Sequence, residues 1–96
     1  MGLDFYHVSD YKRGDLLFSL NHKELDELEE AFSLLHQKTG LGIDLYGETN
    51  FYISHIQILI QILEKEFIHP SAEIKGLIHF LKKATITNEG LTALGD

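Results

Sequence analysis

The side chains that could carry acid–base or metal chemistry in this sequence are six histidines and fifteen carboxylates, with no cysteine among them. A zinc site on one helix needs histidines at i and i+4 with a carboxylate base nearby, and no such motif is present. The histidines lie at positions 7, 22, 36, 55, 69 and 79, too far apart for one helical turn to join two of them. Serine and glycine motifs typical of nucleophile elbows or phosphate loops are also missing. We therefore expect no catalytic residue, metal site, cofactor or enzyme activity.

His55 is the histidine with the most informative position, because it follows an apolar stripe that runs toward Ile58 and Ile62. Two interpretations are open for it. It either forms a hydrogen bond at the edge of the core, which is the commoner situation, or it contributes to a site assembled from several helices.

The strongest chemical signal is acidic. The stretch NHKELDELEEAF, residues 21–32, holds five carboxylates within seven positions and no basic residue between them. Helical periodicity turns Leu25, Leu28 and Phe32 toward the core. It turns Asp26, Glu27 and Glu30 outward and leaves Glu24 and Glu29 at the borders of that face. Carboxylates in the first turn complement the helix dipole, but Glu29 and Glu30 are expected beyond that turn, and Asp26 and Glu30 repel each other. The pattern is typical either of a solvated helix face or of a surface that binds a cationic partner.

A second candidate contact surface lies in DLYGETNFY, residues 44–52, which combines carboxylates with tyrosines in and beside a connector. Tyrosine is enriched at the centres of protein interfaces. Tyr46 and Tyr52 could equally pack over helix ends. If both surfaces bind a partner, the residues responsible are Asp26, Glu27, Glu30, Asp44, Tyr46 and Glu48.

Composition limits the classes of partner and location. A net charge of −7 with only eight Lys and Arg residues argues against nucleic-acid binding. No apolar run reaches the length of a membrane span, and the absence of cysteine is compatible with a reducing compartment. We expect a cytoplasmic protein with one domain, residues 1–96, that contacts no membrane and no nucleic acid.

Hydrophobic periodicity predicts a mainly α fold, a small bundle of three principal helices. The first covers residues 22–38, with Asn21 and Glu24 as a capping box and Gly40 as its stop. The second is the central helix, residues 50–68, and the third starts after Ser71 and reaches Lys82–Lys83. Residues 84–96 either add a short turn of helix or fray.

The N-terminal region is ambiguous in the sequence. Residues 4–9 and 15–20 could pair as a short β-hairpin, or the second segment could be an irregular lead into the first helix. An α+β fold is therefore the alternative to a helical bundle. Residues 39–49 are expected to form an extended, ordered connector.

The segment TGLGIDLYGETNFYISHIQIL, preceded by an acidic leucine-rich helix, resembles small bacterial immunity proteins of contact-dependent growth inhibition and similar toxin systems. The resemblance covers residues 24–63. It implies a role rather than an architecture, because immunity proteins have many unrelated folds. That role is to bind and neutralise a cognate basic toxin domain, for which a ribonuclease is the candidate activity. Carboxylates would then occupy positions that substrate phosphates would take in the toxin.

A second hypothesis, from a different class, is a self-associating helical structural or regulatory module. It requires the second apolar stripe of the central helix, Phe51, Ile58 and Ile62, to be exposed in the monomer and buried between two chains. The protein would then be a homodimer, whereas the immunity hypothesis is compatible with a monomer or a homodimer.

Overall fold

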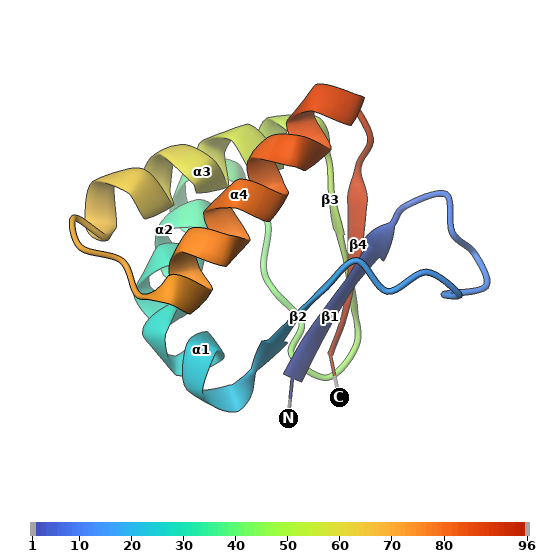
Figure 1. Cartoon of the computed structure of the whole chain (residues 1–96), viewed down its shortest axis with the longest axis horizontal. Coiled ribbons are helices and arrows are strands. Elements are labelled where there is room, and N and C mark those ends of the chain that lie inside the picture. The colour runs from blue at the N-terminus through green and yellow to red at the C-terminus, as the bar shows by residue number, and fades with distance from the viewer. Residues whose placement is uncertain (1, 96) are drawn as a thin grey trace.

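The computed structural model describes residues 2–95 and has two layers, an antiparallel four-stranded sheet with helices stacked on one of its faces (Figure 1). The strands lie in the order β2-β1-β4-β3. The elements in chain order are β1 Gly2–His7, β2 Phe18–Asn21, α1 His22–Glu27, α2 Glu29–Thr39, β3 Glu48–Phe51, α3 Ile53–Glu66, α4 Ala72–Thr87 and β4 Leu91–Gly95.

The expectation of a mainly α bundle is wrong, because the chain has an α+β fold. The N-terminal hairpin is present, with Asp4 opposite Ser19 in an antiparallel pair of strands. Two further strands were not expected. Asn50 and Phe51, predicted to open the central helix, belong to β3, and residues 91–95 form β4 between β1 and β3. The structure does not describe Met1 or Asp96, which lie at the ends of the expected domain.

The alternation of side chains along the strands explains why helices cover only one face of the sheet. Leu3 and Phe5 are buried under the helices, whereas the alternating residues Asp4 and Tyr6 are only partly buried on the opposite face. Strand β4 contributes Ala93, which lies opposite Phe5 on one side and Thr49 on the other. Successive strand residues point to opposite faces, so this register fixes which side of the sheet meets the helices.

Four phenylalanines join the sheet to the helix layer. The ring of Phe5 lies 5.9 Å from that of Phe51 and 5.7 Å from that of Phe80, and the Phe18 and Phe80 rings stack at 5.0 Å. Phe5 lies in β1, Phe51 in β3, Phe18 in β2 and Phe80 in α4. Offset and edge-to-face contacts at such distances add to the free energy gained from burial.

Three predicted helix boundaries are confirmed, at Asn21, Gly40 and Ser71, whereas the central helix covers Ile53–Glu66 and not residues 50–68. The Asn21 side chain accepts a hydrogen bond from the Glu24 backbone amide at 2.9 Å, and the Glu24 carboxylate accepts one from the Asn21 backbone amide at 2.8 Å. Gly40 ends α2 at a φ of 80°, a conformation that favours glycine. Ser71 caps α4, but that helix continues past the predicted Lys82–Lys83 end to Thr87, where Asn88 ends it.

The first predicted helix is interrupted at Leu28, which separates α1 from α2. Leu28 is fully buried, and its amide is shared between the carbonyls of Glu24 and Leu25. No proline or glycine marks this position. The interruption makes Glu29 the first residue of a new helix, which changes the electrostatics of the acidic stretch.

Phe51 and Tyr52 offer a direct test of the sheet, because they are adjacent aromatic residues with 1% and 66% of their surface exposed. Phe51→Ala should lower the free energy of unfolding by about 3–5 kcal/mol, because it leaves a cavity beside Phe5. Tyr52→Ala should change it by less than about 0.5 kcal/mol. Urea denaturation followed by circular dichroism measures both values. Equal effects of the two substitutions would contradict the placement of Phe51 in β3.

Candidate functional site

The exposed carboxylates of the acidic stretch gather where α1 meets α2. Asp26, Glu27, Glu29 and Glu30 are all exposed and, with Ser33, line one shallow depression. We call these four carboxylates the acidic junction. Glu24 does not belong to it, because its side chain is buried in the capping box. The outward orientation predicted for Asp26, Glu27 and Glu30 agrees with this placement.

The acidic junction has little cationic compensation within the chain. Across residues 2–95, no Lys or Arg forms an ion pair with any of the four carboxylates. The nearest partner is His22, whose Nε2 lies 3.5 Å from an Asp26 oxygen at an exposed position. The charge of the junction is therefore directed mainly to solvent, although Glu30 also lines a separate depression that contains Lys38 and Lys65.

The helix break supplies one structural reason for this charge. We expected Glu29 and Glu30 to lie beyond the first turn of a continuous helix, but both lie in the first turn of α2. Carboxylates at a helix N-terminus are stabilised by about 0.3–1 kcal/mol each through the dipole. Part of the like-charge repulsion is thus offset by α2 itself.

An apolar groove adjoins the acidic junction, between α2 and the connector of residues 40–47. It has a volume of about 510 Å³ and shares Asp26, Glu29 and Ser33 with the acidic depression. We call it the α2–connector groove. It is lined by His22, Leu25, Asp26, Glu29, Phe32, Ser33, His36, Gly42, Ile43 and Leu45.

Backbone hydrogen bonds hold the connector in place as the far wall of this groove. The Asp44 amide donates to the Thr49 hydroxyl at 2.8 Å, and the Gly95 amide donates to the Gly47 carbonyl at 2.7 Å. Gly95 also passes so close to Leu45 that a Cβ atom there would collide with the Leu45 backbone. The end of β4 therefore fixes the position of the connector.

The three connector residues that we predicted to bind a partner are used differently from one another. Asp44 accepts a hydrogen bond from the Tyr46 amide at 2.9 Å and so stabilises its own turn. Tyr46 is 77% exposed. Glu48 forms an ion pair with Arg13 at 2.6 Å. None of the three lines the acidic depression or the α2–connector groove.

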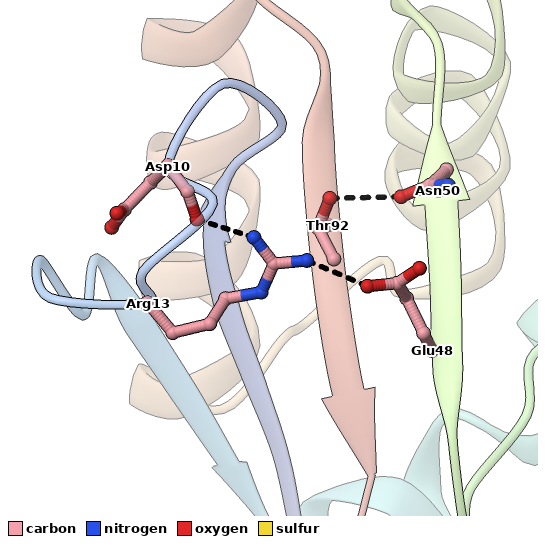
Figure 2. A network of polar contacts seen from close by, with 5 residues as sticks. All are labelled: Asp10, Arg13, Glu48, Asn50 and Thr92. Carbon is pink, nitrogen blue, oxygen red and sulfur yellow. Dashed lines mark hydrogen bonds and ion pairs between the residues drawn. The ribbon is translucent and has the colours of Figure 1, made fainter.

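Glu48 belongs to a polar network on the face of the sheet away from the helices. Figure 2 shows Arg13 reaching from the loop of residues 8–17 across β4, where its guanidinium bonds both the Asp10 carbonyl and Glu48. Beneath it, Thr92 is 1% exposed and donates to the Asn50 side chain at 2.8 Å. The loop thus covers part of this face.

Asp10 organises that loop. Its two carboxylate oxygens accept hydrogen bonds from the amides of Asp15 at 2.9 Å and Gly14 at 3.3 Å. The hydrogen bond from Asp15 is the main cause of a lowered pKa for Asp10; burial opposes it, and Gly14 and the Arg13 charge reinforce it. The carboxylate is therefore bound in its ionised form.

Two of the histidines, His55 and His7, form local contacts. His55 accepts a hydrogen bond from the Tyr52 amide at 3.1 Å and so caps the start of α3. His7 Nδ1 lies 3.1 Å from Glu89, which accepts a hydrogen bond from Ser9 at 2.8 Å. Within residues 2–95, no group of three His, Asp or Glu side chains is arranged to hold a metal ion.

No protein-family model, curated protein or solved structure matches this chain. None of the helices within residues 2–95 has the length and apolar content needed to cross a membrane.

Sequence reasoning missed the α2–connector groove. Phe32 was assigned to the core and Ile43 to a connector without known neighbours, although both line this surface. The alternation of Leu41, Ile43 and Leu45 was the available signal, since it indicates that one side of the connector packs against something. The alternation does not identify α2 as the element against which the connector packs.

Lowering the pH should release the loop of residues 8–17. Because ionised Asp10 accepts the Gly14 and Asp15 amides, its contribution to stability is complete above about pH 4 and is lost as the pH falls through its lowered pKa. An NMR titration should place the Asp10 midpoint below that of ordinary aspartates, with faster exchange of both amides beneath it. Asp10→Asn should remove this transition. A midpoint at or above the ordinary value would contradict the network.

Proposed function

We propose that this protein is an immunity protein that binds and neutralises a cognate basic toxin domain through the acidic junction. The observation that carries the proposal is the gathering of four exposed carboxylates around one depression, without a Lys or Arg ion pair among residues 2–95. A protein inhibitor of this kind needs a complementary surface and no active site of its own.

Electrostatics explain how such a surface would act. Toxins that cleave RNA bind phosphates in a basic cleft, and carboxylates held on a rigid helical scaffold can occupy the same cleft. Complementary charge also raises the rate of association, which matters for an inhibitor that must reach its toxin before the substrate does. We propose a ribonuclease as the toxin activity and the cytoplasm as the place of action.

The surroundings of the acidic junction favour a protein partner over a simple cation. The junction continues into the α2–connector groove, which exposes the partly buried side chains of Phe32, Ile43 and Leu45. Interfaces between proteins combine a desolvated apolar centre with a charged rim. Charge and apolar surface lie side by side here in that manner.

The competing hypothesis of a self-associating module loses the surface on which it relied. Phe51 and Ile62 are only 1% and 5% exposed, and Ile58 packs partly buried against the core. The stripe is therefore used inside the monomer, by the sheet and the neighbouring helices. The connector residues Asp44, Tyr46 and Glu48 remain a proposed second contact, and all three are exposed.

Charge reversal tests the acidic junction. Asp26→Lys/Glu30→Lys should weaken binding to the cognate basic toxin domain by at least about a hundredfold, since it removes two favourable charges and adds two repulsive ones. Isothermal calorimetry at two salt concentrations measures the affinity, and wild-type binding should loosen as salt is added. In cells that also express the toxin, wild type should rescue growth and the charge-reversed variant should not.

A matched control separates local charge from net charge. Asp15→Lys/Glu64→Lys alters the net charge equally, at two exposed positions that line neither the depression nor the groove. Glu64 forms an exposed ion pair with Lys82, and pairs of this type contribute little to stability. If the control weakens binding as much as the test variant, or if neither does, the acidic junction is not the toxin-binding surface.

A further inference from the structure

We infer that the α2–connector groove holds the apolar side of a cationic amphipathic helix of the toxin, with its positive side chains on the acidic junction. This inference rests on the proposed function and adds the kind of segment that the partner presents. It differs from a purely electrostatic contact, because the apolar groove, and not charge alone, would select the partner.

The floor of the groove is apolar and accessible. Phe32, Ile43 and Leu45 are each partly buried against the core while lining the groove, and Leu25 closes its base. A volume of about 510 Å³ accommodates several side chains of the size of leucine. Burying such surface contributes roughly 25 cal/mol for each Å² removed from water.

The charged side chains around this floor are of one sign. Asp26 and Glu29 line the groove, and Glu27 and Glu30 continue the same charge in the adjoining depression. No Lys or Arg among residues 2–95 lines either cavity. Two histidines, His22 and His36, complete the rim. A neutral apolar segment would leave these carboxylates uncompensated, whereas Lys or Arg flanking an apolar stripe would pair with them.

The walls explain why the segment is helical. One wall is α2, whose backbone groups are bonded within the helix, and in the other wall the Asp44 amide is taken by Thr49. Neither wall is an edge strand of the described sheet, so the groove meets a partner mainly through the side chains that line it. A segment that enters it must satisfy its own backbone, and an amphipathic helix does so while presenting apolar residues at i, i+3, i+4 and i+7.

The test uses synthetic peptides and a substitution that fills the groove. The probe is a fluorescent peptide of about 14 residues, roughly four helical turns, with Leu along one face and Lys on the other. A scrambled peptide of the same composition has no apolar face. Fluorescence anisotropy measures both affinities, and amide chemical shifts of the protein show where the probe lies.

Gly42→Phe is suited to filling the groove without straining the fold. Gly42 has no positive φ, and a Cβ there would meet only a His36 ring carbon at 3.8 Å, an ordinary contact. Gly14→Phe is the matched control, because Gly14 also has no positive φ, has open space around it, and lies in the loop of residues 8–17. Ser33→Arg provides a second, independent block from the exposed surface of α2.

The expected result is that wild type binds the amphipathic peptide at least about tenfold more tightly than the scrambled one. Gly42→Phe and Ser33→Arg should each remove this difference, and Gly14→Phe should keep it. Shifts should centre on Phe32, Ile43 and Leu45. Equal binding of the two peptides, or an affinity that ignores Gly42→Phe, overturns the inference.

The same variants distinguish failure of this inference from failure of the proposed function. A toxin complex that is weakened by Asp26→Lys/Glu30→Lys but unaffected by Gly42→Phe would leave the immunity role standing and remove the groove. If the affinity for the toxin is unchanged by the charge reversal, the proposed function is wrong, regardless of the peptide results.

Discussion

The structure depends on the pairing of β4 with two strands at once. β4 hydrogen-bonds to β1 along one side and to β3 along the other, so the N-terminal hairpin and the strand before α3 share a sheet through it. These pairings join residues far apart in sequence, as in the Thr92–Asn50 hydrogen bond, which spans 42 positions. Folds dominated by such distant contacts form more slowly than helical bundles of similar size, because the chain must close long loops before the contacts stabilise it.

The candidate binding surface also depends on β4. The connector is held as a wall of the groove in part by Gly95, at the end of β4, which bonds to Gly47 and approaches Leu45 closely. On the opposite wall, the interruption at Leu28 places Glu29 and Glu30 in the first turn of α2. The start of α2 thus shapes the acidic half of the surface, and the distant strand β4 positions the connector that forms the apolar half.

Elements with local signals could be predicted from the sequence, and elements that depend on distant partners could not. Asn21, Gly40 and Ser71 act within a few residues of their own position, so their side-chain chemistry identified helix boundaries correctly. Strand β4 is five residues long, and its first three residues are all buried, so it lacks the alternation that marks a strand. The acidic face followed from helical periodicity, whereas the groove beside it required knowing that the connector lies against α2.

The outer strands of the sheet, β2 and β3, have only four residues each. Both leave one side of their backbone without a strand neighbour in the described sheet, and long edges of this kind recruit other chains. Here each edge is short, and β3 carries the exposed Glu48 and Asn50. The sheet edges of this small domain are therefore poor templates for edge-to-edge aggregation, even though its helix layer exposes an apolar groove.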